Sequence, residues 1–200
     1  MYRRFFISLL ALVLVGVACG DDDTTETSAA TEAGRTAATA DTISTVEYQA
    51  FRAQPVACDA AAPAPALDMT FSQPDDVGLS GVVTAVVATS CGDITIELNA
   101  EVAPAAVNSF VHLAEQGYFD GTVSHRIVAG FMIQAGDPSA TGRGGPGYLL
   151  PDELPANGFI YSRGTVAMAN AGANTGGSQF FMMLADAPLP PAYSVFGTVT

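Results

Sequence analysis

The sequence predicts a mainly β fold, an antiparallel barrel or sandwich with a helix covering one end. Short runs of β-branched and aromatic residues lie between positions 82 and 199, and glycine- and proline-rich turns separate them. One segment, beginning at Pro104, has the spacing of an amphipathic helix. Many short strands and a single clear helix therefore favour a β architecture.

Residues 1–18 have the layout of an export signal, in which Arg3 and Arg4 precede an apolar run too short to span a bilayer. Small residues then precede Cys19, as in a bacterial lipobox, although Gly16 stands where leucine is usual. We expect Cys19 to be lipidated and to anchor an exported protein to the outer face of the bacterial cell membrane. The alternatives are a plain secretory signal and an uncleaved anchor.

Residues 19–80 are predicted to form a tether. Its first part is rich in Asp, Thr, Glu, Ser and Ala, which cannot bury enough apolar surface to order the chain, and residues 60–66 form an Ala- and Pro-rich spacer. The net charge of the whole chain is -13 and its only basic side chains besides histidine are arginines. A nucleic-acid partner is not expected, because phosphate binding requires a basic surface.

The folded domain is predicted to span residues 81–200. Residues 82–89 and 93–98 are two strands separated by a short turn at Cys91, which is typical of a hairpin. In the helix that starts at Pro104, the residues Val107, Phe110, Val111 and Ala114 share one face. Gly117 is expected to end this helix in a left-handed conformation.

The second half of the domain supplies the remaining strands. Residues 124–137 alternate as two short strands about Gly130, and residues 163–170, 179–184 and 194–199 are three further candidates. The loop at 142–147 matches the spacing of a dinucleotide-binding turn, but no crossover helix follows and Pro146 interrupts it. We interpret this loop as a tight turn.

Cys58 and Cys91 remain once Cys19 is assigned. In an exported chain, two such cysteines favour a disulfide that would tie the spacer to the first hairpin, and two unpaired thiols are the alternative. The loop entropy for this separation corresponds to about 3.5 to 4 kcal/mol of stabilisation.

Arg126 is the candidate site residue. An arginine in an acidic protein is usually a structural ion-pair partner, but large apolar residues and side-chain amides surround this one in the sequence. His125 is expected to face the interior with a satisfied hydrogen bond, and His112 to be a partly exposed surface or packing residue. With no cysteine or carboxylate cluster beside the histidines, no metal site is predicted.

Several blocks in family order, from about Val83 to the last residue, carry a resemblance. They are Asn108-Ser109-Phe110, Gly117-Tyr118-Phe119-Asp120-Gly121-Thr122, His125-Arg126-Ile127, Gly130-Phe131-Met132-Ile133-Gln134, Gly136-Asp137-Pro138, Ala167-Met168-Ala169-Asn170-Ala171 and Gly177-Ser178-Gln179-Phe180-Phe181. These blocks resemble the cyclophilin peptidyl-prolyl isomerases. The resemblance implies a closed eight-stranded antiparallel barrel capped by two helices. Because family members continue beyond the Phe196-Gly197 motif, we expect the C-terminal helix and strand to be missing from this chain.

The resemblance also implies an active site. Arg126 matches the catalytic arginine and Gln134 the glutamine that contacts the peptide carbonyl. The implied substrate-binding residues are Phe131, Met132, Phe181 and Leu189 in the proline pocket, Ala169, Asn170 and Ala171 in the backbone-reading segment, Gln179 as a supporting residue, and Tyr193 where many relatives have histidine.

The expected function is rotation of X-Pro bonds in exported proteins by a monomer that needs no cofactor. The expected partners are proline-containing polypeptides and, through the lipid, a membrane. The alternative is a chaperone or adaptor that binds proline-containing segments with little turnover.

Overall fold

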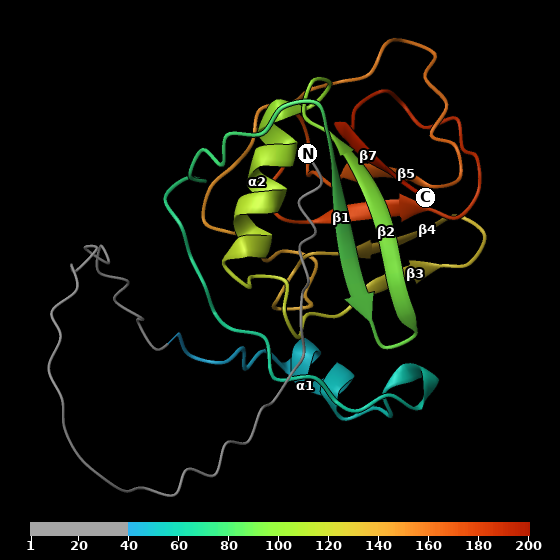
Figure 1. Ribbon diagram of the computed structural model, residues 1–200. Helices are drawn as coiled ribbons and strands as arrows, with labels where there is room; N and C mark the ends of the chain where they lie inside the picture. Colours follow the sequence, from blue (N-terminus) through green and yellow to red (C-terminus); the bar gives the residue numbers. More distant parts are fainter. Residues whose placement is uncertain (1–39) are drawn as a thin grey trace, which may run out of the picture.

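The computed structural model describes residues 40–200, and the export signal and Cys19 lie outside these residues. Its main element is an antiparallel sheet of order β1-β2-β7-β5-β6-β4-β3, with α2 packed beside it (Figure 1). The elements are α1 (Val46–Arg52), η1 (Ala57–Asp59), β1 (Val82–Thr89), β2 (Gly92–Asn99), α2 (Pro104–Glu115), β3 (Arg126–Val128), β4 (Met132–Ala135), β5 (Thr165–Met168), β6 (Phe180–Met183) and β7 (Val195–Val199).

The predicted mainly β class is confirmed, and each predicted strand of the domain is present. The sheet has seven strands within residues 40–200, with β1 and β3 at its two ends and no pairing recorded between them. Closure into an eight-stranded barrel therefore stays a prediction. The same part of the chain contains no helix that is long and apolar enough to cross a membrane.

Helix α2 begins and ends where its sequence indicates. Pro104 opens it, and the carboxylate of Glu153 accepts hydrogen bonds of 2.9 Å from the amides of Ala105 and Ala106. These bonds satisfy amide groups that the first turn of a helix leaves unpaired. Gly117, with φ of +75°, follows the C-cap. The buried face, which includes Val107 and Phe110, packs into the main core.

His112 belongs to the interior and not to the surface. Its exposed fraction is 3%. The ring of Phe71 meets it edge to face, with centroids 5.2 Å apart, and the amide of Asp75 donates to its Nδ1 atom at 3.3 Å. Of the two roles predicted for His112, packing is the one observed.

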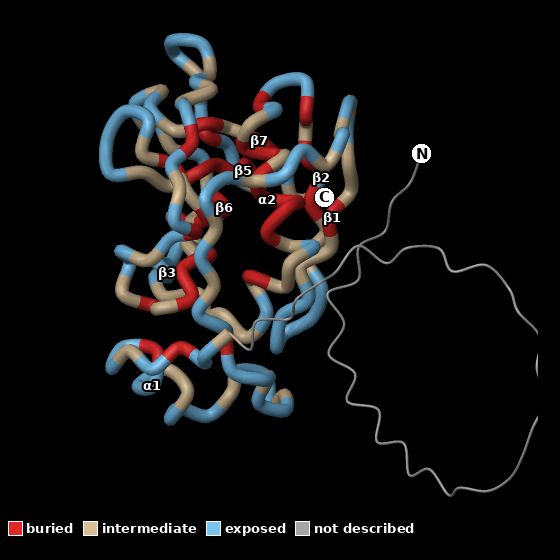
Figure 2. Tube along the Cα trace, turned by 90° about the vertical axis from the view of Figure 1, so that its left-hand side faces the viewer, coloured by how far each residue is buried: buried red, intermediate tan, exposed pale blue. Residues whose placement is uncertain are grey.

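The sheet divides the apolar residues into two layers. Strand β6 is buried along its whole length, and its side chains alternate between the layers. Phe180 and Met182 belong to the main core, whereas Phe181 and Met183 belong to a second cluster on the opposite face. Burial is highest in α2 and in strands β5 and β6, with a smaller buried group around α1 (Figure 2).

Residues 41–71 form a segment that we call the strap, which packs against the domain. The hydroxyl of Tyr48, in α1, donates to the carbonyl of Gly121 at 2.8 Å and accepts from the amide of Ala66 at 2.6 Å. Tyr48 is fully buried, with Ile43 and Ala66 in the same small cluster. The assignment of residues 19–80 to a tether is thus corrected for its described part. Helix α1 has one buried residue and too few turns to be stable alone, so sequence periodicity did not reveal it.

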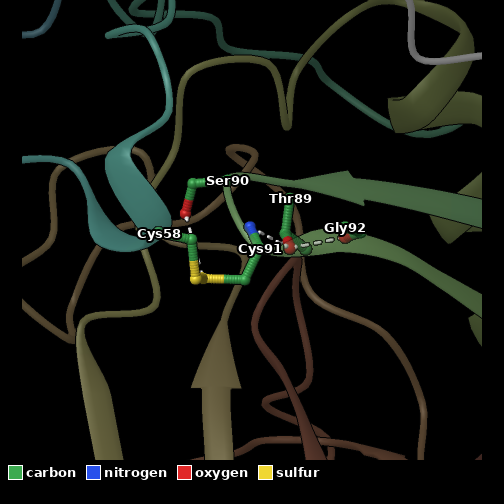
Figure 3. Close-up of a disulfide and its surroundings, with 5 residues drawn as sticks. All are labelled: Cys58, Thr89, Ser90, Cys91 and Gly92. Atoms are coloured by element: carbon green, nitrogen blue, oxygen red, sulfur yellow. Dashed lines mark hydrogen bonds between the residues drawn. A yellow bond between two sulfur atoms is a disulfide. The ribbon is translucent and has the colours of Figure 1, made fainter.

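A disulfide joins Cys58 to Cys91, the pairing expected from the sequence. It links η1 to the turn between β1 and β2 (Figure 3). In that turn the hydroxyl of Thr89 donates to the carbonyl of Gly92 at 2.6 Å and accepts from the amide of Cys91 at 3.1 Å. The disulfide therefore attaches the middle of the strap to an ordered hairpin.

Candidate active site

One row of paired residues crosses four neighbouring strands. Arg126 pairs with Gln134, Gln134 with Phe181, and Phe181 with Ala167. Because residues directly opposite each other point to the same face of a sheet, these side chains lie together on the face away from the main core.

A chain of hydrogen bonds connects the polar side chains of this row to a loop. Arg126 donates from Nη1 to Oε1 of Gln134 at 3.4 Å, and Gln134 donates from Nε2 to Oε1 of Gln179 at 2.9 Å. Gln179 in turn donates from Nε2 to the carbonyl of Gly144 at 2.9 Å. Within residues 40–200 no carboxylate forms a salt bridge with Arg126, which is exposed. Arg126 is therefore not a structural ion-pair residue of the described chain.

The predicted pocket residues come together in the second apolar cluster. The rings of Phe181 and Tyr193 are perpendicular, with centroids 5.3 Å apart. The cluster includes the predicted Phe131, Met132, Phe181, Leu189 and Tyr193. It also includes Tyr161 and Met183, which the sequence analysis did not name. The alternation along β6 would have indicated Met183, since it lies two residues after Phe181.

The segment around Asn170 borders this cluster. The side chain of Asn170 donates from Nδ2 to the carbonyl of Ala192 at 2.8 Å, and this bond ties Asn170 to the loop that carries Tyr193. The backbone amide of Ala169 donates to the backbone carbonyl of Gln179, and the backbone amide of Ala171 donates to the hydroxyl of Thr175. In the described part of the chain no hydrogen bond uses the backbone of Asn170. This peptide unit is free to pair with an extended ligand.

Residues 84–200 match the family model described as cyclophilin type peptidyl-prolyl cis-trans isomerase/CLD. The chain belongs to the cyclophilin family. The strap lies before the matched residues, so its contacts with the cyclophilin domain are not part of the family match.

Individual relatives agree with this assignment. A probable peptidyl-prolyl cis-trans isomerase B of Mycobacterium tuberculosis is 46% identical over 131 residues, which cover 58% of this chain and 42% of the relative. A peptidyl-prolyl cis-trans isomerase of Helicobacter pylori is 43% identical over 123 residues, covering 61% of this chain and 76% of the relative. The chain thus spans less than half the length of its mycobacterial relative.

A solved structure gives the same result for the fold. It is a cyclophilin type peptidyl-prolyl cis-trans isomerase of Cryptosporidium parvum, solved in the presence of the dipeptide Ala-Pro. The TM-score is 0.55 at 37% sequence identity, over 60% of this chain and 78% of the other.

Residues 137–147 of the cyclophilin domain form the loop that holds Gln179, and we call them the glycine loop. The fully buried carboxylate of Asp137 accepts from the amides of Ser139 at 2.8 Å, Gly142 at 2.7 Å and Gly144 at 3.1 Å. Burial alone would raise the pKa of Asp137, but hydrogen bonds from the Ser139 hydroxyl and from these three amides outweigh it, and the pKa lies below its usual value. The amides of the glycine loop therefore converge on an internal carboxylate.

His125, beside the catalytic candidate Arg126, differs from its prediction. Both of its ring nitrogens are buried and have no hydrogen-bond partner among the described residues. Burial lowers the pKa of His125, and the nearby Asp137 carboxylate and Gln179 side chain offset this in part. The imidazole is held neutral at pH 7. The prediction of a satisfied hydrogen bond was wrong, because the polar groups near His125 pair with one another instead.

No cluster of metal-binding side chains is found in residues 40–200.

Proposed function

We propose that this chain is a peptidyl-prolyl cis-trans isomerase that binds a proline-containing peptide on the outer face of its sheet. The observation that carries the proposal is Arg126, which has no ion-pair partner within residues 40–200 and is oriented by Gln134 beside the apolar cluster. Membership of the cyclophilin family and the Ala-Pro dipeptide used with the Cryptosporidium parvum structure support the same activity.

The reaction requires the site to stabilise the twisted transition state of the X-Pro bond by a modest amount more than the planar peptide. Rotation of a peptide bond has a barrier of about 18–20 kcal/mol, because the nitrogen lone pair is shared with the carbonyl. A turnover of about 1000 per second corresponds to a barrier near 13 kcal/mol, so the site must remove about 6 kcal/mol. No covalent bond breaks, and binding alone supplies this energy.

Each group has a distinct role in the proposed mechanism. The proline ring enters the apolar cluster formed by Phe131, Met132 and Phe181, and this holds it still. Gln134 and the free backbone of Asn170 bind the peptide on either side of the rotating bond. Arg126 donates to the prolyl nitrogen as that atom becomes pyramidal. This bond exists in the twisted state and not in the planar one, so it accelerates rotation.

The test is a protease-free isomerisation assay with a short X-Pro peptide. Arg126→Ala is expected to lower kcat/KM by about a hundredfold, because the donor to the transition state is lost. Its unfolding free energy should stay within about 0.5 kcal/mol of the parent, because Arg126 is exposed. Arg126→Lys is the matched control, which keeps the charge but not the planar donor. Full activity of Arg126→Ala would refute the mechanism.

A binding module is the second candidate, because the same groove would hold proline-containing segments without turnover. Rescue of client refolding by Arg126→Ala to the same extent as by the parent chain would favour this function.

We further propose that the protein is exported, acts as a monomer on exported polypeptides, and is anchored by lipidated Cys19. The basic and apolar residues at 3–17 and the small residues before Cys19 support this. Detergent partitioning of the parent chain against Cys19→Ser tests the anchor. Equal partitioning into the aqueous phase would exclude it. Light scattering after size exclusion measures the oligomeric state.

A further inference from the structure

The strap contacts the glycine loop at both of its ends. Near the start of the strap, the hydroxyl of Thr45 donates to the carbonyl of Ser139. At its end, the amide of Phe71 donates to the carbonyl of Pro146 at 2.7 Å. Between these points, Ala140 of the loop is 6% exposed and lies in the small apolar cluster formed with the strap. The strap therefore holds the loop at Ser139, Ala140 and Pro146, near its two ends.

Two glycines of the domain are places where the strap approaches too closely for a side chain. A Cβ atom at Gly121 would lie 2.9 Å from the amide nitrogen of Ala66 and closer still to the carbonyl of Ala64. A Cβ atom at Gly147 would lie 2.7 Å from the carbonyl oxygen of Phe71. Such distances do not occur for real Cβ atoms without rearrangement, so the strap is closely fitted to the domain.

The glycine loop is also part of the active site. The carbonyl of Gly144 accepts from Gln179, which accepts from Gln134, which accepts from Arg126. Displacement of the loop would move Gly144, and Gln179 would lose the bond that fixes its rotamer. The orientation of Gln134 and Arg126 depends on that rotamer. A continuous path of contacts thus runs from Thr45 to Arg126.

The disulfide controls how firmly the strap is held. Cys58 and Cys91 are both exposed, and η1, which carries Cys58, has no buried residue. In the residues that the structure describes, the disulfide is the only covalent link between η1 and the hairpin. Its loss would free the middle of the strap and leave the contacts of Thr45, Tyr48 and Phe71 to hold the segments on either side.

We propose that the strap is a positioning element of the active site, and that reduction of the Cys58–Cys91 disulfide loosens it and lowers catalysis. The proposal rests on the isomerase function proposed above. The reductant is a small dithiol. Its thiolate attacks one sulfur, the disulfide accepts two electrons and two protons, and the dithiol leaves as a cyclic disulfide while Cys58 and Cys91 become thiols.

The first experiment compares the oxidised and the dithiol-reduced full chain, both carrying Cys19→Ser so that no other thiol takes part. Hydrogen exchange at the amides of Gly142 and Gly144 should become about tenfold faster on reduction, because the loop opens more often. Amides of β5 and β6 should be unaffected, which distinguishes a loosened loop from general unfolding. Unchanged exchange in the loop would overturn the proposal.

The second measurement follows the glutamine side chains and the activity of the active site. The side-chain amide resonances of Gln134 and Gln179 should shift on reduction, and kcat/KM should fall by about three- to tenfold. Peptide affinity should change less than kcat/KM, since the apolar cluster that would hold the proline ring shares no residue with the cluster around the strap. Faster loop exchange with unchanged glutamine resonances would overturn the positioning role.

Matched variants test the strap without a reductant. Gly121→Ala should reproduce the effect of reduction, because the added methyl group meets the strap backbone. Gly81→Ala is its control, since Gly81 has the same φ of +68° but no atom within 4 Å of an added Cβ. Thr45→Val should also speed loop exchange, and Thr45→Ser, which keeps the hydroxyl, should restore the parent rate.

These readouts separate the two proposals. If the oxidised chain catalyses no isomerisation, the proposed function fails, while loop exchange and the glutamine resonances still decide whether the strap positions the site. If the oxidised chain is active and its kcat/KM is unchanged on reduction and in Gly121→Ala, the strap proposal fails alone.

Discussion

The two faces of strand β6 have the same residue types and different tasks. Phe180 lies in the main core, where the rings of Phe110 and Phe119 meet it edge to face at 5.4 and 5.9 Å. Phe181 lies on the other face, against Tyr193 and next to Gln134 in the neighbouring strand. Both are almost fully buried in the free protein. Burial alone therefore does not distinguish a core residue from a pocket residue, and the position of polar partners around the cluster does.

The largest effect is expected on the core face. Phe180→Ala should lower the free energy of unfolding by about 3–5 kcal/mol, because it removes a ring from a closely packed site and leaves a cavity. Urea denaturation followed by circular dichroism measures this. The folded fraction should still bind a proline peptide with the parent affinity. A weaker affinity would mean that the two faces are not independent.

For Phe181→Leu, we expect a large loss of peptide affinity and only a small loss of stability. Peptide affinity should fall about tenfold, since the ring forms a wall of the proposed proline pocket, while the free energy of unfolding falls by only about 1 kcal/mol. Titration with a fluorescent proline peptide gives the affinity, and Phe180→Leu is the matched control. If Phe180→Leu weakens binding as much as Phe181→Leu, the assignment of the pocket to the outer face is wrong.

Tyr161 tests whether the outer layer also contributes to stability. Its hydroxyl donates to the carbonyl of Tyr193 at 3.0 Å and accepts from the amide of the same residue at 3.2 Å. Tyr161→Phe should lower the free energy of unfolding by about 1 kcal/mol, because a buried backbone group loses its partner. Tyr193→Phe, which leaves both bonds intact, is the control. Equal denaturation midpoints for the parent chain and Tyr161→Phe would contradict this role.

The smallest expected effect is a dependence of stability on pH that comes from His125, the neighbour of Arg126. The pKa of His125 is lowered in the folded chain, so the unfolded chain binds more protons as the pH falls below about 6.5. Stability should therefore decrease between this pH and the lower folded pKa, and His125→Gln should flatten the decrease. Denaturation midpoints measured at several pH values check this. An unchanged slope in His125→Gln would show that other groups cause it.

At lower pH, Asp137 should also make the folded protein less stable as the pH falls. Its folded pKa is lowered, so its contribution is present above the unfolded pKa, near about 3.9, and is lost as the pH falls through the folded pKa. His125 and Asp137 therefore titrate in different pH ranges, and the comparison of the parent chain with His125→Gln is best made above about pH 5.

Much of the site was predictable because it depends on local patterns. The alternation about Gly130 places Arg126, Gln134 and Met132 on one face, and the row across β3, β4 and β6 follows once those strands pair. The family blocks named the pocket residues that the second cluster contains. Tyr161 was missed because it lies in an isolated bridge with Ala187 and has no strand periodicity around it.

The sequence by itself determined which segments form strands, both ends of α2 and most of the residues that gather in the second apolar cluster. These depend on side-chain period and on capping residues, which act within a few positions of the chain. Only the tertiary structure decided that the strap packs on the domain, that Asp137 fills the glycine loop, and that no hydrogen bond within residues 40–200 reaches the ring nitrogens of His125. Each of these depends on groups distant in sequence or on a competition between partners. Short segments such as α1 gain stability only from such contacts, so their composition does not reveal it.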